Sequence, residues 1–136
     1  QIMSDNGDYL LPSYSNGWIP DNLSTRKRII EKLRTWAPFS NSSPVEGIKK
    51  ALRSHSQQKV ALYVFGDDFT GGSYDRALDS VARLNPTREN GSRRVKIHGV
   101  AFPWGVSNRF ATLMRELAFK NDGVFLALST DMLLKK

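Results

Sequence analysis

The sequence predicts a single α/β domain with a mostly parallel sheet. The first observation is the order of strand-like and helix-like segments along the chain. Apolar, strand-like runs at residues 60–65, 95–102 and 124–128 alternate with amphipathic segments of helical spacing, and right-handed crossovers between parallel strands produce this order. The second is that residues 60–65 are apolar throughout, which is expected of a central strand covered on both faces.

Length and composition restrict the class of protein. A chain of 136 residues suits one domain with a hydrophobic core. The absence of cysteine excludes disulfides, thiol catalysis and cysteine metal sites. No apolar run reaches the roughly 18 residues of a transmembrane helix, and residues 1–11 lack a signal-peptide pattern. We therefore expect a soluble protein without a membrane segment, in a compartment that the sequence does not identify.

The chain is basic, with 20 Lys and Arg residues against 13 Asp and Glu residues and a net charge of +7. The basic residues are spread over predicted helix surfaces and chain ends, and none lies in a recognisable nucleic-acid-binding motif. We therefore expect no nucleic-acid partner. A positive surface would instead assist encounter with an acidic protein partner.

Two helices are predicted before the first long apolar run. The first begins near Ser24 and ends before Pro38, because the residue before proline avoids the helical region. We expect it to bury an apolar face made of Ile29, Ile30, Leu33, Trp36 and Ala37. The second has Ser43 as N-cap, Pro44 at the first helical position and Glu46 completing a capping box. Its inner face contains Val45, Ile48, Ala51 and Leu52.

Two further helices are predicted between the later strands. One begins after Ser73, ends at Asn85 and Pro86, and buries Ala77, Leu78, Val81 and Leu84. The other follows Ser107 or Asn108, ends at residues 121–123, and buries Phe110, Leu113, Met114, Leu117 and Ala118. At the N-terminus, residues 1–3 and 9–11 are candidate strand pieces around a turn at residues 5–7.

The most informative segment is KVALYVFGDDFTGG, residues 59–72, in which the apolar run stops at Gly66 and two adjacent acids follow. Open α/β sheets bind ligands at the carboxyl ends of their strands. Asp67 and Asp68 would repel each other and resist desolvation there unless a cation, hydrogen-bond donors or water compensated them. The segment therefore predicts a binding site or a tightly anchored loop.

Several segments, in this order, resemble the second half of a von Willebrand factor A domain. They are SNGWIPDN (15–22), NSSPVEGIKKAL (41–52), VALYVFGDDFTGG (60–72), RRVKIHGVAF (93–102) and RFATLMRELAFKNDGVFLAL (109–128). The resemblance implies a three-layer, mostly parallel, doubly wound sheet with helices on both faces. It also implies a metal-ion-dependent adhesion site, in which Mg²⁺ or a similar cation binds oxygen ligands and a partner's carboxylate. By position, Ser43 matches the loop threonine of that site. Asp67 matches the aspartate of its Thr-Asp-Gly motif, which contacts the metal through water, while Gly66 and Asp68 replace the threonine and glycine.

The family's main ligand motif, Asp-x-Ser-x-Ser, does not occur in the chain. The resemblance therefore implies a truncated domain over residues 1–136, with a partial site that binds a divalent cation weakly or not at all. The missing strands could belong to a longer protein, come from another chain, or be absent because the fold has rearranged. A rival alignment takes residues 68–73 as a degenerate first-strand motif, although the two strand-like runs that follow favour the first alignment.

Each candidate residue has a structural role and a functional one. Asp67 is either a metal contact or a carboxylate that caps a loop, and Ser43 is either a metal ligand or the N-cap already described. Asp68 and Thr70 are candidate binding residues, with loop capping by Asp68 and a loop hydroxyl at Thr70 as the alternatives. Trp104 is a candidate partner anchor or an internally packed lid.

Two classes of function remain open on the sequence. A non-enzymatic protein-binding module of von Willebrand factor A type fits the resemblance. A metal-dependent hydrolase or phosphoryl-transfer enzyme would use Asp67 and Asp68, but the chain lacks a phosphate-binding Gly-rich Lys loop and a paired general base. His98 lies within an apolar run and is expected to be a buried neutral histidine rather than a base. The binding module is the favoured hypothesis.

Overall fold

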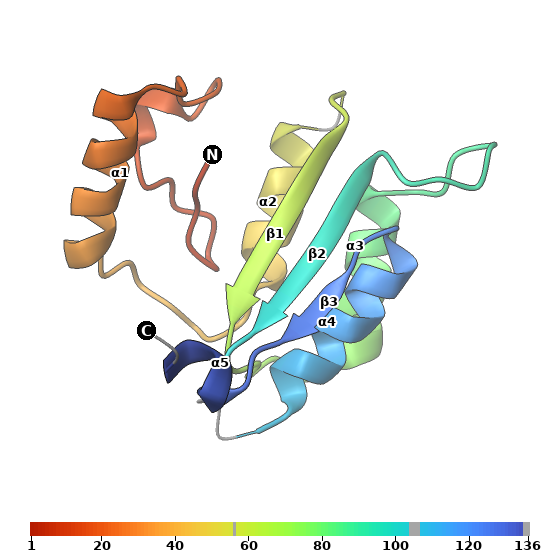
Figure 1. Ribbon diagram of the computed structural model, residues 1–136. Coiled ribbons are helices and arrows are strands. Elements are labelled where there is room, and N and C mark those ends of the chain that lie inside the picture. The colour runs from red at the N-terminus through yellow and green to blue at the C-terminus, as the bar shows by residue number, and fades with distance from the viewer. Residues whose placement is uncertain (56, 104–106, 135–136) are drawn as a thin grey trace.

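The computed structural model describes residues 1–55, 57–103 and 107–134 (Figure 1). None of the helices in these ranges is both long and apolar enough to cross a membrane. The elements follow in the order 3₁₀ helix Pro12–Tyr14, α1 (Leu23–Thr35), α2 (Val45–Ser54), β1 (Val60–Gly66), α3 (Tyr74–Leu84), β2 (Val95–Ala101), α4 (Arg109–Lys120), β3 (Phe125–Ala127) and α5 (Thr130–Leu134).

The three strands form one parallel sheet in the order β1–β2–β3. Val60 pairs with Val95 at the start of β1, and Gly66 pairs with Ala101 at its end. The connections between the strands contain α3 and α4 (Figure 1). The predicted α/β class and parallel sheet therefore agree with the structure, and all three predicted strands lie within a residue or two of their expected positions.

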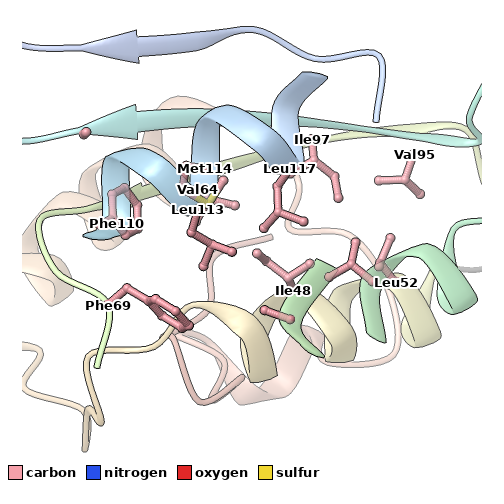
Figure 2. Packing of buried hydrophobic residues seen from close by; sticks show 13 residues of the cluster. Ile48, Leu52, Val64, Phe69, Val95, Ile97, Phe110, Leu113, Met114 and Leu117 are labelled. Carbon is pink, nitrogen blue, oxygen red and sulfur yellow. The ribbon is translucent and has the colours of Figure 1, made fainter. Parts of the chain in front are cut away.

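Helices α2, α3 and α4 pack against a single face of the sheet, where the hydrophobic core lies (Figure 2). On β1 the core side chains are Val60, Leu62 and Val64, which alternate with residues facing the other way. The opposite face, here called the open face, carries Ala61, Tyr63, Phe65, Lys96, His98, Val100 and Leu126.

The open face corrects the prediction for the first strand. Tyr63 and Phe65 are 60% and 61% exposed, and in the described part of the chain β1 is the edge of the sheet, not a central strand covered on both faces. The reason is that a continuously apolar run shows that both faces of a strand are apolar. It does not show that each face has a covering layer.

Helix α1 lies apart from the sheet (Figure 1). It begins where predicted, and the Asn22 side chain accepts a hydrogen bond from the Thr25 N–H at 2.9 Å as N-cap. The predicted burial is wrong, because no residue of α1 is buried and both Ile30 and Leu33 are exposed. An amphipathic pattern identifies the face of a helix that could be buried, but it does not show that another element covers that face.

Helix α2 is capped by a distant segment instead of the predicted capping box. The Ser43 side chain makes no cap hydrogen bond, and Glu46 pairs with Lys49 at 2.7 Å. The Asp5 carbonyl accepts a hydrogen bond from the Gly47 N–H at 2.6 Å, so the N-terminal segment satisfies a donor in the first turn. The candidate strand pieces in that segment make a single antiparallel bridge, between residues 3 and 9.

Helices α3 and α4 agree more closely with their predictions. Ser73 caps α3 by accepting a hydrogen bond from the Arg76 N–H at 3.3 Å, and all five predicted core residues of α4 are buried. The buried Asn85 ties the end of α3 to the neighbouring elements. Its amide nitrogen donates to the Val95 carbonyl at 2.7 Å and to Asn121 Oδ1 at 2.8 Å, and its Oδ1 accepts from the Val95 N–H at 3.1 Å.

Candidate functional site

The carboxyl ends of β1 and β2 lie at one edge of the sheet, and three loops meet beyond them. These loops are residues 40–43, which precede α2, residues 67–72, which follow β1, and residues 107–109, which lead into α4. We call this cluster of loops the polar corner. Close packing beneath it depends on Gly66, because a Cβ there would lie 2.5 Å from the ring of Phe110.

Asp68 joins two loops of the polar corner. Its Oδ1 accepts hydrogen bonds from the Phe69 N–H at 2.8 Å and from the Ser107 hydroxyl at 2.9 Å. The side chain is half-buried, and a carboxylate with two donors forms stronger hydrogen bonds than a neutral acceptor. The arrangement favours the interpretation of Asp68 as a loop anchor.

Asp67 differs from its neighbour although the two residues are adjacent in sequence. It is exposed, and no described residue donates a hydrogen bond or forms an ion pair with its carboxylate. All acceptor sites of its two carboxylate oxygens are therefore available to an external cation, hydrogen-bond donor or water.

Thr70 and Ser43 belong to a second set of contacts. The Thr70 N–H donates to the Ser42 carbonyl at 2.9 Å, and its hydroxyl donates to the Asn41 carbonyl. The Ser43 N–H donates to Asn41 Oδ1 at 3.1 Å and to Asp5 Oδ2 at 3.3 Å. Thr70 therefore acts as a loop hydroxyl. The backbone of Ser43 is fixed, while its side-chain oxygen has no structural bond among the described residues.

Arg109 is a component of the polar corner that sequence reasoning missed. Its guanidinium donates to the Gly71 carbonyl and lies over the rings of Phe69 and Tyr74, at 5.5 and 5.7 Å from their centroids. In sequence Arg109 is one more basic residue at a helix start. Only the fold brings it over two aromatic residues that lie more than 30 positions earlier.

The metal ligands expected from the resemblance are only partly assembled. Within the described ranges, no group of three His, Asp or Glu side chains is placed to hold a metal ion. Mg²⁺ requires near-octahedral oxygen coordination. Asp67 and the Ser43 hydroxyl are the candidate ligands of the predicted set, and Asp68 could add only its Oδ2, because its Oδ1 accepts the hydrogen bonds from Ser107 and Phe69. This donor set does not fit a resident metal ion on its own.

Two further predicted residues lie elsewhere. His98 is half-buried on the open face, where its Nδ1 accepts a hydrogen bond from the Val124 N–H at 3.1 Å and its ring stacks on Tyr63 at a centroid distance of 4.7 Å. The predicted hydrogen bond is present, but the histidine is not fully buried, because no layer of the described residues covers this face. Trp104 lies outside the described residues.

Comparisons of the chain with protein-family models, with curated proteins and with solved structures each found no match. The resemblance to a von Willebrand factor A domain therefore rests on the ordered sequence segments alone.

Proposed function

We propose that this chain is a non-enzymatic protein-binding module of von Willebrand factor A type, whose partner contacts the open face of the sheet. The observation that carries the proposal is the exposure of large apolar side chains in adjacent positions on β1, β2 and β3. Tyr63 and Phe65 on β1 are accompanied by Val100 and by Leu126, which is 48% exposed. Contiguous apolar patches on a protein surface commonly mark interaction sites.

The composition of the open face also supports a protein partner. Aromatic side chains are enriched at the energetic centres of interfaces, where they bury much area with few rotatable bonds. Tyr63 is already held by stacking on His98, and Phe65 lies 6.4 Å from Phe102 between ring centroids. These contacts restrict the rings before binding and so reduce the entropy lost on association.

The polar corner would supply a second, weaker contact within the same proposal. Asp67, with the Ser43 hydroxyl, would contribute to a divalent-cation site shared with an acidic residue of the partner. The net charge of +7 would assist the approach of such a partner.

The competing function is a metal-dependent hydrolase or phosphoryl-transfer enzyme that uses Asp67 and Asp68. One observation favours this function: Asp67, which is exposed and accepts no hydrogen bond from the described residues, lies next to a second acid, Asp68, at the end of β1. The two hydrogen bonds that Asp68 accepts at Oδ1, from Ser107 and Phe69, give this acid a structural role and so favour the binding module, although its Oδ2 accepts no hydrogen bond from the described residues.

The test compares variants of the open face with a matched control. A partner captured from extract and then purified should bind Phe65→Ser at least about tenfold more weakly than the wild type, a loss of about 1.4 kcal/mol. Phe119→Ser is the control, because Phe119 is 82% exposed but lies on α4, away from the open face. Equal binding by Phe65→Ser and the wild type would contradict the proposal. So would Mg²⁺-dependent hydrolysis of a phosphate ester that is lost in Asp68→Asn.

A further inference from the structure

A hollow of about 580 Å³ lies at the amino ends of β1 and β2, at the end of the sheet opposite the polar corner. One part of its wall is the loop that joins α3 to β2 (Figure 1). Its lining includes four basic residues, Lys59, Arg88, Arg93 and Lys96, and one acidic residue, Asp122. We call this hollow, defined by these five residues, the basic hollow.

Three cations of the basic hollow have no partner in the described part of the chain. Lys59, Arg88 and Lys96 are exposed, and their side chains form no hydrogen bond or ion pair with a described residue. Asp122 supplies a single negative charge, and its Oδ2 already accepts a hydrogen bond from the Arg93 N–H at 2.6 Å. The basic hollow therefore has an excess of positive charge, which a bound anion would offset.

The loop that carries Arg88 is held by its own hydrogen bonds. The Arg88 N–H donates to the Ser92 carbonyl and the Gly91 N–H donates to the Arg88 carbonyl, both at 2.9 Å. Gly91 has a φ of 80°, a conformation that favours glycine. The guanidinium of Arg93 donates to the carbonyl of the buried Asn85 and so ties the loop to the core. The backbone of this wall is thus ordered before any ligand binds, which reduces the entropy lost on association.

The lining of the basic hollow also indicates the class of its ligand. Among the described residues that line it, none has an apolar or aromatic side chain. Protein partners commonly insert apolar or aromatic anchors, and single-stranded nucleic acids stack their bases on aromatic rings. Neither class would find those contacts here. Ammonium and guanidinium groups instead bind phosphate oxygens through charge-assisted hydrogen bonds.

We propose that the basic hollow binds a compact ligand that carries several phosphate groups, either free in solution or as the headgroup of a lipid. Lys59 and Lys96 would contact the phosphates from the sheet. Arg88 would contact them from the loop, where a guanidinium can bind two phosphate oxygens side by side. The inference does not require a protein partner on the open face, so it and the proposed function can fail separately.

The test is a titration with inorganic tripolyphosphate, followed by NMR of the backbone amides. The signals of Gly91, Ser92 and Lys96 should shift, because these residues line the basic hollow. The double variant Lys59→Gln/Lys96→Gln should bind tripolyphosphate at least about tenfold more weakly than the wild type, since two of the charged contacts are lost. Both lysines are exposed, so the variant should keep the fold.

The matched control is Lys27→Gln/Lys32→Gln, which removes the same charge from two exposed lysines of α1. Its affinity for tripolyphosphate should stay within about twofold of the wild type, because distant exposed charges are screened by salt. An equal loss of affinity in the two double variants would overturn the proposal, since only net charge would then matter. Equal affinity of the wild type and Lys59→Gln/Lys96→Gln would also overturn it.

Two further probes identify the source of the phosphate groups. Binding of tripolyphosphate without binding to vesicles assigns a free ligand. Additional binding to phosphatidylcholine vesicles that contain phosphatidylinositol bisphosphate, but not to vesicles of phosphatidylcholine alone, assigns a lipid headgroup. Either result supports the proposal. A glutamate peptide of the same net charge that binds as tightly as tripolyphosphate would overturn it in favour of an acidic polypeptide.

Discussion

The adjacent acids Asp67 and Asp68 are predicted to differ sharply in their effect on stability. Asp68→Ala removes two hydrogen bonds, from the Phe69 N–H and the Ser107 hydroxyl. Each is expected to contribute about 1 kcal/mol, the value of a typical hydrogen bond and less than a fully buried bond to a charged group, because the carboxylate is only half-buried. The free energy of unfolding should therefore fall by about 2 kcal/mol.

Asp67→Ala is the matched control, since it removes the same charge from the neighbouring position. Asp67 is exposed and has no hydrogen bond in the described structure, so its loss should change the free energy of unfolding by no more than about 0.5 kcal/mol. Asp68→Asn keeps an oxygen acceptor and should cost about 1 kcal/mol or less, because both donors can still be satisfied.

Urea unfolding followed by circular dichroism measures all three variants. With a slope of about 1.5 kcal/mol/M, a loss of 2 kcal/mol lowers the midpoint by about 1.3 M, well above the error of the method. Equal midpoints for Asp67→Ala and Asp68→Ala would refute the assignment of Asp68 as the anchor between the loops that follow β1 and precede α4. A larger loss in Asp67→Ala would reverse the two roles.

Three further predictions concern other parts of the chain. Asn85→Ala leaves three buried polar groups without a partner and should destabilise by about 3 kcal/mol in the same urea assay, whereas Asn90→Ala, in an exposed loop, should cost less than about 0.5 kcal/mol. Hydrogen bonds from Arg26, and then its positive charge, lower the pKa of Asp21. The stabilisation of α1 by this pair should thus be complete above about pH 4 and be lost as the pH falls further; a carboxyl NMR titration that shows no depressed pKa would contradict it. Calorimetry with Mg²⁺ or Mn²⁺ should detect weak binding or none, and tight binding that Asp67→Ala abolishes would disprove the partial-site hypothesis.

The parts of the fold that were predictable from sequence are those encoded locally. Helix α4 has apolar residues at helical spacing along its whole length, and all five expected core residues are buried. Helix α3 begins directly after its N-cap Ser73, whose hydroxyl accepts a hydrogen bond from the Arg76 N–H in the first turn. Both signals lie within the element that they define, so no information about the rest of the chain was needed.

The errors arise where a distant segment determines the outcome. Ser43 and Glu46 have the spacing of a capping box, but the Asp5 carbonyl, about 40 positions earlier, binds the start of α2 instead. Asn85 looks like a simple helix stop, although its side chain joins three elements in the core. No local sequence pattern distinguishes a nearby hydrogen-bond partner from a distant one, because the distant partner comes close only when the chain folds.

The apolar run that ends in two acids predicted a binding site or a tightly anchored loop at the end of β1. The structure shows the anchored loop, held by Asp68, and the binding site stays a prediction. Which acid would be engaged depends on Ser107, nearly 40 residues later. The exposure of Tyr63 and Phe65 could not be predicted either. A strand with apolar residues on both faces has the same sequence pattern whether or not a second layer covers it.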